Sequence, residues 1–135
     1  KRAGIVSQST QTIENVQEIV NILMSKVVDL RFINTICFPT KRNQEQIKEL
    51  SEKCDVMIVI GSFTSANSKR LTDLSNQRNK RSYQVTCALE IDEKWLKDCD
   101  AVGISAGAST PDNIIKEVID RVKEIGNVQE EEIYA

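Results

Sequence analysis

The chain has 135 residues, of which 40% are hydrophobic and 28% are charged, with a formal net charge of -2. This composition is typical of a soluble globular protein and excludes a disordered chain. The small net charge excludes a general attraction to nucleic acid or membrane surfaces, and no apolar run is long enough to span a membrane. We therefore expect no nucleic-acid partner and no membrane partner.

The cysteine and histidine content limits the metal sites and catalytic nucleophiles that the chain can form. The four cysteines, Cys37, Cys54, Cys87 and Cys99, form no C-x-x-C pair, which argues against zinc ribbons and thioredoxin-like motifs. Histidine is absent, which excludes Ser–His and Cys–His nucleophiles within this chain. No signal peptide is visible, so we expect a cytoplasmic protein with reduced thiols. The chain has no initiator Met, and we expect it to be part of a longer protein.

The first third of the chain predicts two strands and two helices. Residues 3–7 (AGIVS) predict a strand, and Thr12 can cap a helix whose apolar residues recur at spacings of three and four, from Ile13 to Val27. Residues 29–36 predict a second strand. Pro39 then interrupts the chain, and Thr40 can cap a helix that continues to Lys53.

The apolar run from Val56 to Ile60 predicts a parallel strand buried on both faces. Gly61 and a polar loop follow, and the next helix is expected from about Asn67 to Asn76. The rest of the chain predicts a solvated turn at 76–80, a strand at 83–87, a short helix at 92–97, a strand at 101–105 and a last helix from Pro111, capped by Ser109 or Thr110, to Gly126.

Strand–helix alternation through the chain predicts an α/β fold, an open parallel sheet in three α/β/α layers. The loops that follow parallel strands meet at one rim, where such sheets place ligands. This rim would collect hydroxyl, amide and thiol side chains: Ser9, Thr10, Thr35, Cys37, Ser65, Asn67 and Ser109. Together with helix N-termini, these groups suit an anion, phosphate above all. The alternative is that Thr64 or Ser65 is only an N-cap.

Cys37 follows a predicted strand and lies beside the positive end of a helix, which favours thiolate character; the alternative is an inert buried thiol. The other three cysteines are interpreted as core residues, and Trp95 as a packing residue. Lys69 and Arg70 are expected to face solvent.

No acidic pair stands at the rim, which argues against glycosidase chemistry. The residues best match a phosphorylated ligand with a soft metal or a reactive thiol nearby.

Four strings together resemble one family. They are SQSTQ at 7–11, GSFTSANSKRL at 61–71, VGISAGASTP at 102–111, and, within 34–44, NTIC followed by Pro39-Thr40 and the polar Arg42-Asn43-Gln44. They resemble the LytB family of 4-hydroxy-3-methylbut-2-enyl diphosphate reductases of the non-mevalonate isoprenoid pathway. The likeness extends to about Gly126, and the last two strings in this order and spacing are fairly specific.

The resemblance implies an oxidoreductase with a [4Fe–4S] cluster, held by three cysteines from three α/β modules. It implies two-electron reduction of the substrate to isopentenyl and dimethylallyl diphosphate, with ferredoxin or flavodoxin as electron donor. It implies that Cys37 is the third cluster ligand and that Ser9 lies near the hydroxyl end of the substrate. The diphosphate-binding positions that it implies are Ser65, Ala66, Asn67 and Ser109.

The chain departs from the family pattern at two positions. Ala66 stands where many members have a serine, and Ser9 replaces a threonine. The remaining cluster cysteines, two substrate histidines and an acid–base glutamate would precede Lys1, so no catalytic residue is expected here. The resemblance thus divides the chain into the end of a middle module (1–36), a third module (37–126) and an acidic tail or linker (127–135).

We therefore expect the chain by itself to be inactive as a reductase. Two other functions remain open: a phosphate-ligand binding module without redox activity, and an interaction domain whose polar loops are only helix caps.

Overall fold

A computed structural model describes residues 2–33 and 38–126 of the chain. The chain divides into two compact units, residues 1–42 (unit 1) and 43–135 (unit 2), and each is described by itself. Helix α2 (Phe38–Lys53) crosses the boundary between them.

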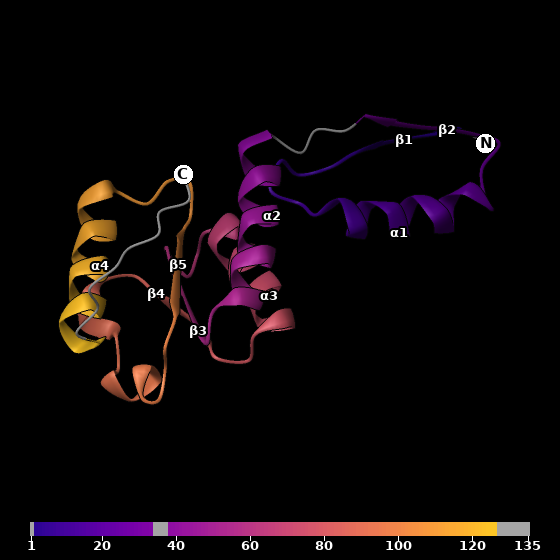
Figure 1. Ribbon diagram of the computed structural model, residues 1–135. Coiled ribbons are helices and arrows are strands. Elements are labelled where there is room, and N and C mark those ends of the chain that lie inside the picture. The colour runs from indigo at the N-terminus through magenta and orange to yellow at the C-terminus, as the bar shows by residue number, and fades with distance from the viewer. Residues whose placement is uncertain (1, 34–37, 127–135) are drawn as a thin grey trace. The chain divides into compact units, whose positions relative to one another are not determined.

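Unit 1 contains a single β–α–β segment (Figure 1). Strand β1 (Arg2–Val6) pairs in parallel with β2 (Asp29–Ile33), in register from Arg2–Asp29 to Val6–Ile33. Between them runs α1 (Ile13–Met24), whose cap at Thr12 is confirmed, because the Thr12 side chain accepts the N–H of Asn15. Strand β2 is described only to Ile33, and the predicted continuation at 34–36 lies outside the described residues.

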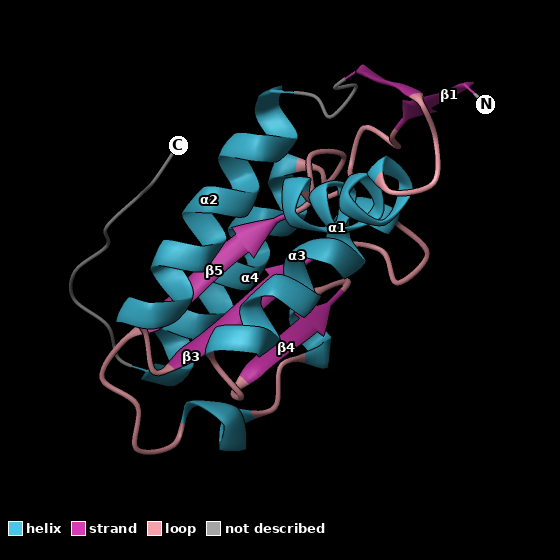
Figure 2. Ribbon diagram, turned by 90° about the vertical axis from the view of Figure 1, so that its right-hand side faces the viewer, coloured by secondary structure: helices cyan, strands magenta, loops and turns pink. Residues whose placement is uncertain are grey.

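Unit 2 is built around a three-stranded parallel sheet in the order β4-β3-β5 (Figure 2). The elements after α2 are β3 (Val56–Ile60), α3 (Ala66–Arg78), β4 (Ser82–Val85), two 3-10 helices (Ala88–Glu90 and Glu93–Leu96), β5 (Val102–Ala106) and α4 (Asp112–Gly126). The α/β fold class with parallel open sheets is confirmed. The prediction that all strands form one sheet is not confirmed, because β1 and β2 pair only with each other.

Helices cover both faces of the unit 2 sheet, with α4 on one face and α2 and α3 on the other (Figure 1). All five β3 residues are fully buried, which confirms that prediction. Ile58 packs in one cluster with Val118 and Val122 of α4. Met57 packs in another cluster, which contains Ile47 of α2 and two α3 residues, Leu71 and Leu74.

Two helix boundaries differ from prediction. Helix α2 begins at Phe38, so Pro39 lies in its first turn and Thr40 inside it rather than at its cap. Proline is tolerated there because the first N–H groups of a helix need no intrahelical partner. Helix α4 begins at Asp112, and Pro111 precedes it while its carbonyl accepts the N–H of Ile115.

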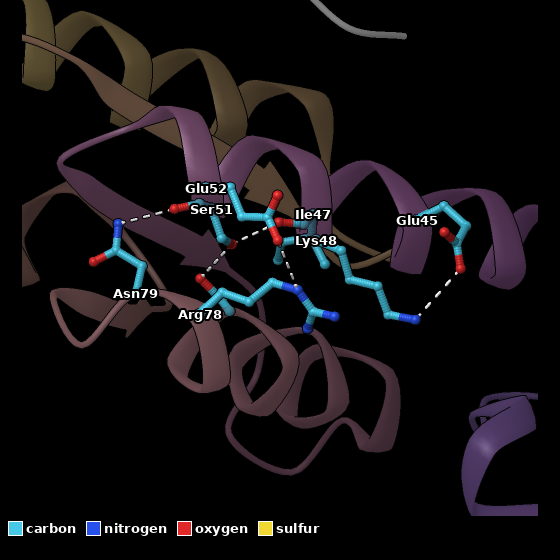
Figure 3. Close-up of polar contacts among 8 residues, drawn as sticks. Glu45, Ile47, Lys48, Ser51, Glu52, Arg78 and Asn79 are labelled. Carbon is cyan, nitrogen blue, oxygen red and sulfur yellow. Dashed lines mark hydrogen bonds and ion pairs between the residues drawn. The ribbon is translucent and has the colours of Figure 1, made fainter.

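Residues 76–78 and 80 are exposed, as predicted, but they do not all form a turn, because α3 continues to Arg78 and its end is tied to α2 (Figure 3). Arg78 pairs with Glu52 at 3.5 Å, and Asn79 Nδ2 donates to the carbonyl of Cys54 at 2.8 Å. Beneath them, the buried Ser75 Oγ lies 3.0 Å from Ser51 Oγ and 2.7 Å from Ser82 Oγ. We call Ser51, Ser75 and Ser82 the serine chain; it joins α2, α3 and β4.

Trp95 is a packing residue, as predicted. Its ring stacks on Tyr83 of β4 with centroids 4.1 Å apart, and it packs against the α4-side core. Arg81, just before β4, donates to the carbonyls of Trp95 at 2.8 Å and Lys97 at 3.0 Å. No helix among the described residues is long and apolar enough to cross a membrane.

Candidate functional site

The loops that follow β3 and β5 lie side by side. Ile60 and Ala106 are paired at the ends of these strands. The N–H of Gly107 donates to the carbonyl of Ile60 at 2.9 Å, and Thr110 Oγ1 donates to the same carbonyl at 3.1 Å. The loop after β5 is therefore bonded directly to the end of β3. We call this edge of the unit 2 sheet the loop edge.

Two glycines bring these loops onto the start of α3. A Cβ atom at either Gly61 or Gly107 would clash with the hydroxyl of Ser68. The Ser68 side chain is 1% exposed, so it cannot turn out to solvent. Both positions accordingly need glycine because the backbone approaches a buried side chain closely.

Ser65 is the N-cap of α3. Its backbone is extended and its Oγ accepts the N–H of Ser68 at 3.3 Å, so the cap interpretation is confirmed for Ser65. Ser62 and Thr64 bond to each other instead, with their hydroxyl oxygens 2.8 Å apart. The hydroxyl proton of Ser65 has no acceptor among the described residues and can donate to a ligand.

Asn67, in the first turn of α3, carries a buried side-chain amide without a partner. Neither its Nδ2 nor its Oδ1 has a hydrogen bond among the described residues, and the same holds for the buried Ser68 Oγ. An unsatisfied buried polar group costs about 1–3 kcal/mol, so most such groups are paired. The orphaned amide of Asn67 is therefore the strongest indication of a ligand at the loop edge.

The start of α3 is also electrostatically suited to an anion. Its first turn contains no acidic residue, and helix geometry leaves the N–H groups of Ala66 and Asn67 without intrahelical partners. Lys69 is exposed, as predicted, whereas Arg70 is half-buried. Ser109 is exposed in the neighbouring loop, two residues after Gly107.

The predicted site residues divide between the two units. Ser65, Ala66, Asn67 and Ser109 all lie at the loop edge of unit 2. Ser9 is exposed in the turn after β1 in unit 1. The strands form two sheets rather than one, so the single sheet edge on which the rim argument depends is not present among the described residues, and the place of Ser9 beside the other site residues stays a prediction.

Cys37 lies outside the described residues, so its predicted place at the site stays a prediction. Cys54 and Cys99 pack against the two cores, as predicted. Burial, with the nearby Asp55 carboxylate, raises the pKa of the Cys99 thiol. Cys87, also interpreted as a core residue, belongs to neither core cluster, and its Sγ lies 4.0 Å from Glu90 Oε1. The described residues contain no group of three or more His, Cys, Asp or Glu side chains that could hold a metal ion.

Sequence reasoning missed one polar residue at the loop edge, Gln84 of β4. Its Nε2 donates to the carbonyls of Gly61 at 3.2 Å and Ser62 at 3.1 Å. The available signal was a glutamine inside a short strand, where a partly buried amide needs partners.

Comparison with known proteins gives a consistent result. The family model described as LytB protein matches residues 1–123. A protein of Geobacter sulfurreducens named 4-hydroxy-3-methylbut-2-enyl diphosphate reductase is 41% identical over 127 residues, covering 94% of this chain and 45% of that protein. A Campylobacter lari protein of the same name is 44% identical over 123 residues, covering 91% and 44%. The chain thus spans less than half the length of these relatives.

Solved structures that resemble this chain are also diphosphate reductases by their descriptions. One described as (E)-4-hydroxy-3-methyl-but-2-enyl diphosphate reductase, the terminal enzyme of the non-mevalonate pathway, is 43% identical with a TM-score of 0.65, covering 91% of this chain and 44% of that one. The Plasmodium falciparum E-1-hydroxy-2-methyl-but-2-enyl-4-diphosphate reductase is 27% identical with a TM-score of 0.83, covering 91% and 39%. With a family model that spans nearly the whole chain and relatives above 40% identity, this chain belongs to the LytB family.

Proposed function

We propose that this chain is part of a 4-hydroxy-3-methylbut-2-enyl diphosphate reductase, and that its loop edge binds the diphosphate end of the substrate. The observation that carries the proposal is the buried amide of Asn67, which has no partner among the described residues. The names of the relatives support the choice of ligand.

The loop edge offers a diphosphate neutral hydrogen-bond donors. The Asn67 amide supplies an Nδ2 donor, and Ser65 can donate its hydroxyl proton while its oxygen still caps α3. Ser109 adds a hydroxyl from the neighbouring loop. The N–H of Ala66 can replace a side-chain donor at that position, because backbone N–H groups at a helix start favour phosphate.

The proposal includes Cys37 as one ligand of a [4Fe–4S] cluster and Ser9 near the hydroxyl end of the substrate. Such a cluster would supply the electrons for the reduction, with a ferredoxin or flavodoxin as donor in the cytoplasm. The described residues do not fit a complete cluster site. A single thiolate cannot hold such a cluster, so we expect this chain alone to hold none and to reduce no substrate.

A titration with inorganic pyrophosphate, followed by amide NMR, tests the binding site. We expect the amide signals at 65–67 and 109 to shift in the wild-type chain. Asn67→Ala should weaken binding about 10- to 100-fold, the effect of losing one hydrogen bond to a charged group. Asn67→Ala should not lower the thermal midpoint, because the amide has no partner to lose.

Asn76→Ala, at an exposed position of the same helix, is the matched control and should bind like the wild type. If the wild-type chain does not bind pyrophosphate, or if Asn67→Ala and Asn76→Ala bind equally well, the proposed site is wrong.

The cluster is tested separately. Anaerobic treatment of the chain with iron and sulfide should produce no stable chromophore. In a longer protein that contains the upstream cysteines, Cys37→Ala should abolish the cluster and leave pyrophosphate binding intact. A cluster that survives Cys37→Ala would show that Cys37 is not a ligand, whereas a longer protein that binds pyrophosphate but forms no cluster even with Cys37 would favour the second candidate, a phosphate-ligand module without redox activity.

A further inference from the structure

The side-chain amide of Gln84 connects strand β4 to the loop that begins the proposed diphosphate site. Gln84 lies on β4, next to β3 in the sheet, where it pairs with Val59. Its Nε2 lies 3.2 Å from the carbonyl oxygen of Gly61 and 3.1 Å from that of Ser62. One amide group thus holds two successive carbonyls of the loop.

Thr72 sets the orientation of this amide. Thr72 Oγ1, in the second turn of α3, lies 3.2 Å from Gln84 Oε1 and 2.9 Å from the Ser68 carbonyl oxygen, and both are acceptors for its one proton. On the other side of the amide, both neighbours are carbonyl oxygens, which only accept. The amide therefore turns its oxygen toward Thr72 and its NH₂ toward the loop.

The Ser62 carbonyl that Gln84 holds also forms the turn into α3. It accepts the N–H of Ser65 at 3.0 Å, and Ser65 is the residue that caps the helix. In a trans peptide the C=O and the N–H point in opposite directions. Since the Gly61 and Ser62 carbonyls point toward Gln84, the N–H groups of the same two peptide units, those of Ser62 and Phe63, point away from it. The direction of the whole loop thus depends on one side chain from another strand.

We infer that Gln84, oriented by Thr72, is a positioning residue for diphosphate binding. It presents the β3–α3 loop and the cap residue Ser65 to the ligand without contacting the ligand itself. This inference rests on the proposed function only for the identity of the ligand, since the hold on the loop is a property of the chain alone.

The test compares Gln84→Met, which keeps the length of the side chain but removes the amide, with Gln77→Met at an exposed position of α3. In the pyrophosphate titration, Gln84→Met should weaken binding about two- to tenfold relative to Gln77→Met, the effect of one hydrogen bond. Gln84→Glu should weaken it further, because a carboxylate would face two carbonyl oxygens. Thr72→Val should cause a smaller loss than Gln84→Met.

A second readout does not depend on the ligand. Amide hydrogen exchange at 62–65 should become faster in Gln84→Met, while exchange in α4 stays at the wild-type rate. Unchanged exchange in this loop, or equal pyrophosphate affinity of Gln84→Met and Gln77→Met, would overturn the inference. If the wild type does not bind pyrophosphate, the proposed function fails, and the exchange result still decides whether Gln84 positions the loop.

Discussion

The two units of the chain differ most in how much of their apolar surface is buried. In unit 2, all five β3 residues are fully buried between α4 on one face and α2 and α3 on the other. In unit 1, Val16 is the one buried apolar side chain among the described residues. Helix α1 leaves Ile19 53% exposed and Ile22 54% exposed, although its apolar periodicity is clear.

This difference shows that a correct amphipathic pattern does not ensure a core. Within unit 1, two strands and one helix bury less apolar surface than the three strands and three helices of unit 2, because burial of an amphipathic face depends on the elements that pack against it. The third strand and the two helix layers of unit 2 provide that packing. The loop edge therefore lies in the unit whose strands and helices bury a continuous core, whereas Ser9 lies in unit 1.

The largest expected effect comes from the centre of unit 2. Ile58→Ala should lower the free energy of unfolding of unit 2 by about 2–5 kcal/mol, because it empties space between β3 and α4. Trp95 is the only tryptophan of the chain and lies in unit 2, so its fluorescence during urea denaturation reports this unit. Val16→Ala, in unit 1, should leave the Trp95 transition unchanged. Equal shifts would mean that the units unfold as one.

The glycine contacts at the loop edge give the next largest effect. Gly107→Ala should destabilise unit 2 by about 1–3 kcal/mol, because the new methyl group clashes with Ser68 Oγ. Adding Ser68→Ala should restore most of the loss, since it removes that oxygen. Gly4→Ala in unit 1 is the matched control, as a Cβ there would have no atom within 4 Å. A double variant as unstable as Gly107→Ala would refute this explanation.

The serine chain should contribute less to the free energy of unfolding than the core and the glycine contacts. Ser75→Ala should cost about 1 kcal/mol in thermal or urea unfolding, because Ser51 and Ser82 keep the carbonyls of Ile47 and Asn79 as acceptors. In unit 1, Ser25→Ala removes an exposed bond to the carbonyl of Ile22 and should have little effect. Equal losses from the two substitutions would contradict a special role for the buried chain.

The smallest effect is expected from Asp55, next to β3, and it depends on pH. Its Oδ2 accepts the N–H groups of Asp100 at 2.9 Å and Ala101 at 3.0 Å, which hold the pKa of this carboxyl below its ordinary value. A lowered pKa contributes stability above the ordinary value, and this stability is lost as the pH falls through the lowered value.

Asp55→Asn should therefore be slightly less stable than the wild type at neutral pH, and the difference should begin to shrink as the pH falls below about 4 and vanish once the pH is below the lowered pKa of Asp55. Asp73→Asn, at an exposed position of α3, is the control. A difference that persists unchanged in acid would show that the charge of Asp55 does not contribute.

Local features were predictable where one short stretch decides them. The run from Val56 to Ile60 is apolar on both faces and is therefore a central strand, and Thr12 caps α1 through its own hydroxyl. The glycine-bounded loop before α3 also lies where predicted. The end of α3 was missed, because Arg78 and Asn79 find partners in α2, Glu52 and the carbonyl of Ser51, more than twenty residues away.

The sequence by itself determined the α/β class, the family and the places of Ser65, Asn67 and Ser109 after the ends of two strands, because periodicity, glycines and helix-start residues act within a few positions. Only the tertiary structure decided that the strands form two sheets, that the Asn67 amide is buried without a partner, and that Gln84 holds the loop. Strand pairing and burial depend on which distant segments meet, and no local pattern specifies that meeting.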